Sequence, residues 1–395
     1  MILSPSLEEA IIGYLIDEGK VTRQQLITHL KIRPATLFEA VIKLEKSGIL
    51  HEPDRKGIKT GRKASSISFN KDYLSFIGVE LNVNRIVCTC LDTEGGQYAL
   101  TTMNLDSREG ASEAQGKVEK AIDDAVRVTE TRNLRIGGIG FADPGLVDTA
   151  NGIGLKAVNI PGWENLGITK WLSEKYQTFC LAFPAPTARA YAEYIAQGKP
   201  SSLFHMELGP TLGGGFVKDG NLFIGDSFAA MEIGHVVVEN EGPLCRCGNR
   251  GCLEAVASLS GIRRRISELI SRGVQTSLKT SEIDYPEFME SVRNLDKPAY
   301  SLAQEIAEKI GVGLASLVAI LNPKVIVMSG GLAGLDDILL SVVRNVLAMR
   351  CLSISVANLE LKVSSLDDSA TASGAAQLVR RKVLSEAVRK IAGKN

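Results

Sequence analysis

The first thirty residues place apolar side chains at the spacing of helices. The first apolar stripe comprises Leu7, Ile11, Ile12, Leu15 and Ile16. It is followed by Gly19, and glycine commonly terminates a helix. Thr22 is followed three residues later by Gln25, so the two side chains can form a capping box. We therefore expect one helix that stops at Gly19 and a second that runs from about residue 23 to residue 30.

A third helix is predicted to begin at Pro34. Proline has no N–H, but the N–H groups of the first helical turn have no partner within the helix, so proline is tolerated there. Apolar residues recur at Leu37, Val41 and Leu44, and Gly48 ends the pattern. Residues 52–64 are charged and contain two glycines, and residues 66–69 then alternate as a strand does. This order of helices and hairpin predicts a winged helix-turn-helix over residues 1–72.

From Tyr73 onward the pattern changes to strands alternating with helices. Strand-like runs occupy residues 76–90, 135–141 and 325–328, and helical patterns cover residues 117–129 and 303–321. Such alternation is typical of α/β architecture. No tandem repeat is visible in the sequence.

The balanced net charge conceals a basic N-terminal segment. Residues 20–71 contain twelve Lys and Arg against four acidic residues, so the segment carries +8 and the rest of the chain −8. A basic helix-turn-helix indicates a double-stranded DNA partner, with the third helix in the major groove. The predicted DNA contacts are Arg33 and Thr36 to bases, Lys43 and Lys46 to phosphates, and Arg55, Lys56, Arg62 and Lys63 from the wing. A helix-turn-helix used for protein contact, or a solvated linker, is the alternative.

Composition narrows the class of protein. Hydrophobic residues make up 45% of the chain, as in ordinary globular proteins. No apolar run reaches about 18 residues, and the N-terminus lacks the basic and apolar regions of a signal peptide. We therefore expect a cytoplasmic protein with no membrane partner.

A short segment of the second half concentrates soft metal ligands. His235, Cys245, Cys247 and Cys252 fall within 18 residues, and Gly248 and Gly251 lie among them. Three thiolates and one imidazole form an accepted set for a closed tetrahedral zinc site. The alternative is a loop of free or disulfide-bonded cysteines, although Cys-x-Cys is too short for an easy disulfide.

The same segment resembles the signature of the ROK family, which comprises repressors, open reading frames and sugar kinases. The resemblance lies in Glu232-Ile-Gly-His235, nine residues, and then Cys-x-Cys-Gly-x-x-Gly-Cys-x-Glu254. It implies that His235 and the three cysteines hold a structural zinc. It also implies that Glu232, His235 and Glu254 bind sugar hydroxyls, although these residues could equally be vestigial.

The resemblance further implies an actin-like, ribonuclease H-like sugar-kinase fold over residues 73–395. Its first lobe would span about 73–190 and include a C-terminal helix around residues 373–391, and its second lobe would span about 191–372. A sugar cleft would lie between the lobes.

Two features of the family's kinases are missing. The Asp-x-Gly-Gly-Thr loop that approaches the ATP phosphates is replaced by residues 80–84, Glu-Leu-Asn-Val-Asn, without glycine. The catalytic aspartate, the base for the attacking hydroxyl, corresponds to Ala185, which follows Pro184. No other carboxylate falls there by spacing, and Asp143 and Asp148 beside a Pro-Gly pair are interpreted as turn formers. A second glycine segment at 209–215 and the adenosine-side glycines at 329–331 are retained, the former in degraded form.

These observations predict a transcriptional regulator, expected to be a repressor of carbohydrate-related genes, with a structural zinc and a catalytically inactive kinase-like domain. We expect a homodimer or higher homo-oligomer whose effector is a sugar or sugar derivative. An ATP-dependent sugar kinase and a regulator controlled by a protein partner remain the alternatives.

Overall fold

The three N-terminal helices form where the apolar pattern predicts them. They are α1 (Leu7–Glu18), α2 (Arg23–Leu30) and α3 (Pro34–Lys46). The predicted capping box is confirmed, because the Thr22 hydroxyl accepts from the Gln25 N–H while the Gln25 side chain accepts from the Thr22 N–H. A small sheet of order β1-β3-β2 joins them, built from β1 (Val21–Thr22), β2 (Leu50–His51) and β3 (Ser66–Phe69).

The computed structural model describes residues 6–51, 66–106, 109–278 and 282–391. The chain divides into two units. Unit 1 comprises Met1–Ala188 together with Asp368–Asn395, and unit 2 comprises Arg189–Asp367. No helix in the described ranges is long and apolar enough to cross a bilayer.

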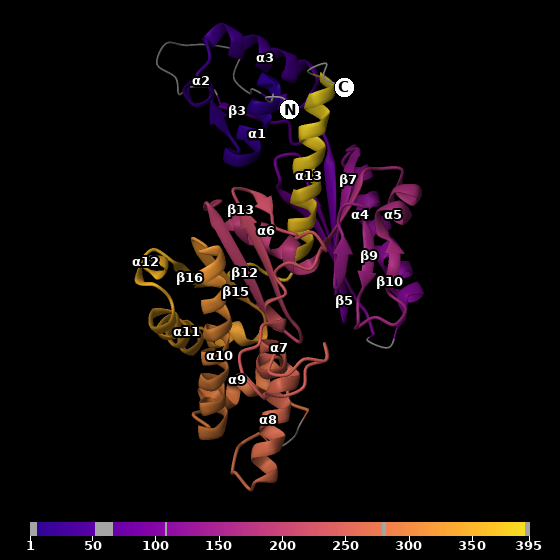
Figure 1. Ribbon diagram of the computed structural model, residues 1–395. Helices are drawn as coiled ribbons and strands as arrows, with labels where there is room; N and C mark the ends of the chain where they lie inside the picture. Colours follow the sequence, from indigo (N-terminus) through magenta and orange to yellow (C-terminus); the bar gives the residue numbers. More distant parts are fainter. Residues whose placement is uncertain (1–5, 52–65, 107–108, 279–281, 392–395) are drawn as a thin grey trace. The chain divides into compact units, whose positions relative to one another are not determined.

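Unit 1 is built on a five-stranded sheet of order β11-β7-β4-β5-β6. The strands are β4 (Ser75–Leu81), β5 (Arg85–Leu91), β6 (Gln97–Asn104), β7 (Ile136–Asp143) and β11 (Cys180–Pro184). One face carries α4 (Ala111–Thr131) and α5 (Ile168–Tyr176), and the other carries α13 (Ala370–Ile391) (Figure 1). A smaller sheet contains β8 (Leu146–Asp148), β9 (Ile153–Lys156) and β10 (Glu164–Gly167).

Two glycines allow α13 to lie directly against the sheet. A Cβ on Gly78 would stand 1.9 Å from the Ala372 carbonyl oxygen, and one on Gly140 would stand 2.1 Å from that of Ala375. Any side chain at these positions would push the helix away, since real Cβ atoms do not approach so closely. The C-terminal part of α13 packs with the N-terminal helices in one core, which includes Val379, Leu384 and Val388.

Unit 2 repeats the sheet of unit 1 without a visible sequence repeat. Its strand order is β14-β13-β12-β15-β16, antiparallel over the first three strands and parallel over the last three, as in β6-β5-β4-β7-β11 of unit 1. The strands are β12 (Ser202–Leu208), β13 (Leu212–Lys218), β14 (Asn221–Leu222), β15 (Val325–Ser329) and β16 (Glu360–Val363).

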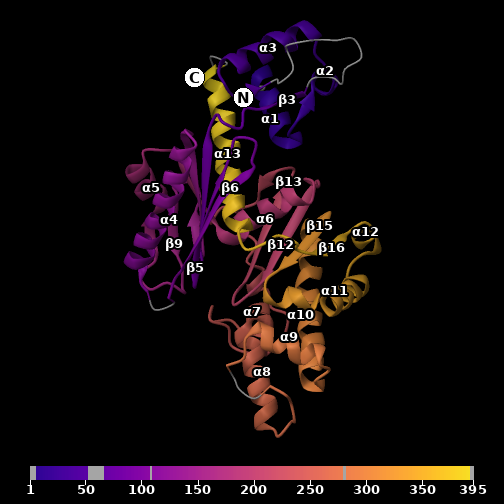
Figure 2. The ribbon, with the colours of Figure 1, turned by 180° about the vertical axis from the view of Figure 1, so that it is seen from behind.

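The helices of unit 2 lie beside its sheet (Figure 2), and apolar side chains of the sheet and helices form the core. They are η1 (Ile233–His235), α7 (Leu253–Ala257), α8 (Leu259–Ser271), α9 (Tyr285–Arg293), α10 (Lys297–Leu321), η2 (Gly331–Leu335), α11 (Asp336–Arg350) and α12 (Ser353–Val356). The remaining helix, α6 (Ala185–Ala196), begins in unit 1 and continues into unit 2.

Candidate functional site

The four predicted zinc ligands come together in unit 2. His235 ends η1, Cys252 caps the start of α7, and Cys245 and Cys247 lie on the loop between them. One ligand atom from each of the four residues lies within 4.8 Å of all the others. None of these cysteines is in a disulfide, which removes the disulfide alternative for this cluster.

The spacing of the ligand atoms fits a tetrahedral metal. The Cys247 and Cys252 sulfurs are 3.7 Å apart, and the Cys245 sulfur is 3.7 Å from His235 Nδ1. A tetrahedron with zinc–sulfur bonds of about 2.3 Å has edges of about 3.8 Å. Nδ1 faces the sulfurs, so Nε2 is left to face Glu232, whose Oε2 is 4.0 Å away. The four residues therefore fit a zinc ion held by three cysteines and one histidine.

Two glycines give the loop its shape. Gly248 and Gly251 adopt φ values of 91° and 70°, which residues with a Cβ rarely take. A Cβ on Gly251 would also stand 1.7 Å from the Glu239 carbonyl oxygen. The chain can thus turn back so that the Cys245 N–H donates to the Asn249 carbonyl at 2.8 Å. This turn is what brings three sulfurs of a short segment to one point.

The predicted sugar residues are neighbours of this cluster. Glu232 precedes His235 on η1, and burial, together with the Glu254 charge, raises its pKa above the ordinary value while His235 lowers it. Glu254 lies in the first turn of α7, where one oxygen accepts from the Leu212 N–H at 3.2 Å. Glu232 thus lies beside His235 and within electrostatic reach of Glu254.

An arginine that the sequence reasoning missed reaches the same carboxylate. The Arg246 guanidinium donates to the second oxygen of Glu254 at 3.4 Å, and the Arg246 side chain is 61% exposed. Both oxygens of Glu254 are therefore engaged within the protein. Arg246 stands between two predicted ligands in Cys-x-Cys, so its nearness to Glu254 could have been suspected from the motif.

The positions of the kinase chemistry lie in unit 1. Pro184 ends β11 and Ala185 begins α6, so the residue at the family's catalytic position carries only a methyl group. The turn that replaces the phosphate loop joins β4 and β5, and Glu80 at its start is 4% exposed. Asn82 donates to the Glu80 carboxylate at 3.2 Å, so two side chains of this segment are paired with each other.

Asp143 is more than the turn former that the sequence suggested. Its Oδ1 accepts from the Gly145 N–H at 2.7 Å, as a turn residue would, but Oδ2 accepts from the Trp163 indole at 2.7 Å. It is 0% exposed, and burial raises its pKa to about 6. Asp143 also pairs in parallel register with Pro184, the residue before Ala185. The Asp143 carboxylate is buried and both of its oxygens accept hydrogen bonds within the protein, so it is not accessible to a substrate. Asp148 is a turn former, accepting from the N–H groups of the two residues after Thr149.

The predicted DNA contacts divide into described and undescribed residues. Arg33 is the N-cap residue of α3 and is exposed, as are Thr36 in the first turn and Lys46 at the end of the helix. Lys43 is exposed too, but its ammonium lies 3.0 Å from the Glu8 carboxylate of α1, which the sequence pattern did not suggest. The remaining predicted contacts lie outside the described residues; they are Arg55, Lys56, Arg62 and Lys63.

Known proteins resemble both parts of the chain. The xylose repressor of Caldicellulosiruptor bescii is 26% identical over 381 residues, which are 95% of this chain and 95% of the repressor. A glucokinase of Thermotoga maritima is 27% identical over 320 residues, 78% of this chain and 98% of the kinase. The shorter match is what a kinase without the N-terminal segment would produce.

A solved structure has the same fold over nearly the whole chain. A ROK family transcriptional regulator, described as a homologue of the E. coli MLC protein, superposes with a TM-score of 0.85 at 22% identity. The superposition covers 98% of this chain and 99% of that one. The fold is thus the mixed α/β, actin-like architecture expected from the sequence. The model of the ROK family matches residues 76–382, and the chain belongs to this family.

Proposed function

We propose that this protein is a DNA-binding transcriptional regulator, acting as a repressor of carbohydrate-related genes, whose kinase-like domain has lost catalysis. The observation that carries the proposal is the full-length similarity to the xylose repressor, which covers 95% of both chains and so includes the N-terminal helices. The glucokinase match, by contrast, covers 78% of this chain. The exposure of Arg33 and Thr36 at the start of α3 and of Lys46 at its end is consistent with the same conclusion.

DNA contact is proposed to occur through α3. Arg33 and Thr36 stand at the N-terminal end of the helix, the end that reads bases when such a helix enters the major groove. Lys46 lies in the last turn and is proposed to contact phosphate. Lys43 would contribute less than Lys46, because the Glu8 carboxylate already offsets part of its charge.

The direct test uses DNA fragments selected from the host genome by the full-length protein. Lys46→Ala should weaken binding on every sequence and reduce the salt slope by about 1, whereas Arg33→Ala should alter sequence preference. Lys120→Ala, an exposed lysine on α4, removes the same charge elsewhere in unit 1 and should leave binding unchanged. Equal effects of all three substitutions, or no selected DNA, would count against the proposal.

Loss of kinase activity follows from Ala185 and from the turn at Glu80. A methyl group cannot take the proton of an attacking hydroxyl, and loss of a general base typically costs about 10²–10⁴ in rate. Incubation with MgATP and a panel of sugars should yield no phosphosugar. Turnover at the ordinary kinase rate of about 1–100 per second would support the kinase alternative instead.

The proposed effector is a sugar or sugar derivative bound by Glu232, His235 and Glu254. Two carboxylates beside an imidazole can accept hydrogen bonds from adjacent hydroxyls. Zinc held by His235 and the three cysteines would fix the positions of these side chains. Because Arg246 already donates to Glu254, a sugar must displace it, and modest affinity is expected.

A thermal-shift screen against sugars tests the effector. Glu232→Gln should abolish a sugar-induced shift, and Arg246→Ala should enlarge it by removing the competing donor. Glu241→Gln, an acidic residue on the same loop that is not predicted to touch sugar, serves as the control. If no sugar acts at millimolar concentration, regulation by a protein partner becomes the better explanation.

A further inference from the structure

Helix α3 carries two apolar stripes on different sides. The first is buried in the core and comprises Leu37, Ala40, Val41 and Leu44. The second comprises Ala35, Phe38 and Ile42, and we call it the exposed stripe, because Ala35 and Phe38 are exposed and Ile42 is half-buried. With 3.6 residues per helical turn, its three members lie within about 60° of one another around the helix axis. An apolar surface therefore remains open on the helix proposed to contact DNA.

Phe38 is the largest side chain of the exposed stripe, and it is 48% exposed. Its ring is contacted from α2, because the central carbon of the Arg23 guanidinium lies 5.2 Å from the ring centroid, within the range of a cation–π contact. Arg23 is the first residue of α2 and directly follows Thr22, whose capping box with Gln25 fixes the start of that helix. The ring is thus supported by α2 while about half of its surface stays open to solvent.

The charges near the exposed stripe fit a DNA duplex. Arg33 precedes the stripe and Lys46 follows it along α3, both are exposed, and residues 20–71 together carry +8. Cations of this kind contact phosphates, whereas apolar side chains contact the methyl groups that thymines present in the major groove. Exposed Glu39 is repelled by phosphates but can accept a hydrogen bond from a cytosine amino group, so the residue next to Phe38 also suits base edges.

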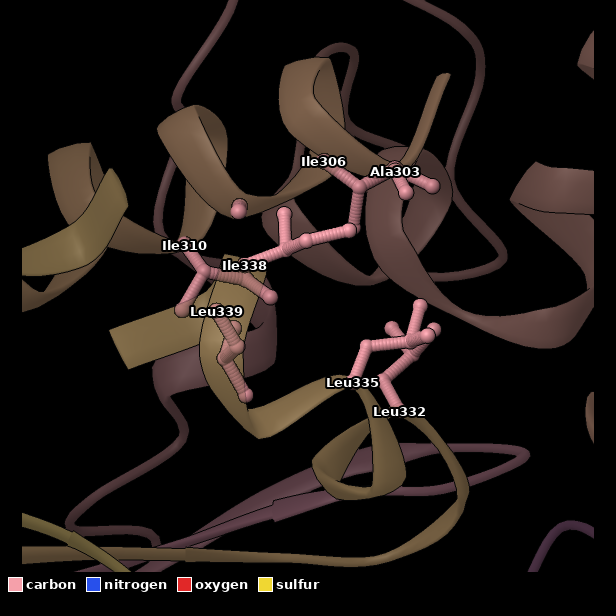
Figure 3. Close-up of a pocket in the computed structure, with 8 residues that line it drawn as sticks. Ala303, Ile306, Ile310, Leu332, Leu335, Ile338 and Leu339 are labelled. Carbon is pink, nitrogen blue, oxygen red and sulfur yellow. The ribbon is translucent and has the colours of Figure 1, made fainter. Parts of the chain in front are cut away.

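The exposed stripe differs from an apolar pocket found in unit 2. That pocket lies among η2, α10 and α11, and all eight residues that line it are apolar (Figure 3). Its volume of about 10 Å³ is close to that of one water molecule, so it is a gap in core packing that admits no larger ligand. The exposed stripe faces solvent instead, and it can contact a partner as large as a DNA duplex.

We propose that Phe38 contacts the 5-methyl group of a thymine in the major groove and so sets part of the sequence preference of this protein. Binding would bury the open part of the ring together with the methyl group, which is favourable for both apolar surfaces. Arg23 acts as a positioning residue that supports the ring. This inference deepens the proposed DNA binding through α3, on which it rests, and it adds an apolar contact to the polar and charged ones already named.

The test replaces single thymines by deoxyuridine, which removes only the methyl group, in the DNA fragments that the full-length protein selects. At one thymine or more, wild type should bind about fourfold more weakly after replacement, as expected for about 0.8 kcal/mol per buried methyl group. Phe38→Ala should bind the two forms equally, because the shorter side chain no longer reaches the methyl. Phe38→Leu should retain a preference for thymine. Phe223→Ala, which truncates a phenylalanine that is 49% exposed in unit 2, should behave as wild type.

The outcomes separate this inference from the proposed function. Wild type that binds its selected DNA equally well after every thymine replacement overturns the inference and leaves the proposed DNA binding intact. A folded Phe38→Ala that keeps the wild-type preference for thymine also overturns it, and unchanged DNA affinity of this variant would assign the exposed stripe to a protein partner. Circular dichroism establishes that each variant is folded. If the full-length protein selects no DNA, the proposed function fails together with the inference.

Discussion

The Arg389 guanidinium, near the end of α13, donates to the Glu9 carboxylate of α1 at 2.7 Å, joining two residues 380 positions apart in the sequence. Leu384 and Val388 of the same helix are fully buried in the core that α1 and α3 share. Because the N-terminal half of α13 lies on the sheet of unit 1, one helix connects that sheet to the N-terminal helices.

The buried apolar contacts of α13 should contribute more to the free energy of unfolding than the Arg389–Glu9 ion pair does. Leu384→Ala should lower the free energy of unfolding by about 2–5 kcal/mol, because it leaves a cavity in a closed core. Arg389→Ala should cost about 0–1 kcal/mol, since the Arg389 side chain is largely exposed and water screens the pair. Urea unfolding of both variants, with exposed Lys390→Ala as control, measures the difference. A Leu384→Ala variant as stable as wild type would show that this core does not join the two parts.

The cysteine cluster should hold about one zinc per chain, as closed Cys₃His sites do. Cys247→Ser should release the metal and lower the melting temperature, because a structural site contributes to the free energy of folding. Cys247 is exposed, so the substitution removes a ligand without disturbing core packing. Cys351→Ser, outside the cluster, should retain the metal. Elemental analysis of protein never exposed to chelator decides the matter, and absence of zinc would refute the assignment.

The contact between Gly331 and Tyr285 predicts unequal costs for two similar substitutions. Gly331→Ala should destabilise the protein by about 1–3 kcal/mol, because a Cβ at Gly331 would stand 2.2 Å from an atom of the buried Tyr285 ring. Gly334→Ala should cost less, because it meets the end of the flexible Met289 side chain. Gly116→Ala, in α4 with nothing within 4 Å, should instead stabilise by about 0.5–1 kcal/mol. Chemical unfolding of the three variants checks this order, and a neutral Gly331→Ala would contradict the packing of Tyr285.

Asp143 should make stability depend on pH. Its pKa is about 6 in the folded protein against an ordinary value of 3.8, so the folded state holds the proton more tightly. Its contribution to stability is therefore fully present below pH 3.8 and is lost as pH rises through about 6. The free energy of unfolding should therefore fall by about 3 kcal/mol between pH 3.8 and pH 7 on account of Asp143.

Urea unfolding of wild type and Asp143→Asn from pH 4 to pH 7 isolates this effect as the difference between two curves. The difference should change over pH 4–6 and be constant above pH 7. Asp148→Asn is the matched control, because hydrogen bonds from Asn151 lower the pKa of half-buried Asp148 and reverse the direction of the pH dependence. Parallel curves for wild type and Asp143→Asn would show that folding does not raise the pKa of Asp143.

Features that depend on neighbours in the sequence could be predicted from it. The Thr22–Gln25 capping box and the helix beginning at Pro34 follow from contacts within one turn, and both formed as expected. The clustering of His235 with three cysteines was equally accessible, because a short loop with two glycines can close on itself. The methyl group at Ala185 and the missing glycines at residues 80–84 are also local facts of composition.

Only the tertiary structure showed the relationships between distant segments. Two sheets share one strand order although no repeat is visible in the sequence, because backbone pairing can persist where side chains differ. The sequence suggested a turn role for Asp143 but not its hydrogen bond from the Trp163 indole. It suggested a phosphate contact for Lys43 but not its ion pair with Glu8. Tyr285 reaches Gly331 across 46 positions of sequence. Burial and partner choice arise when remote segments pack together, so no local pattern of residues could have specified these contacts.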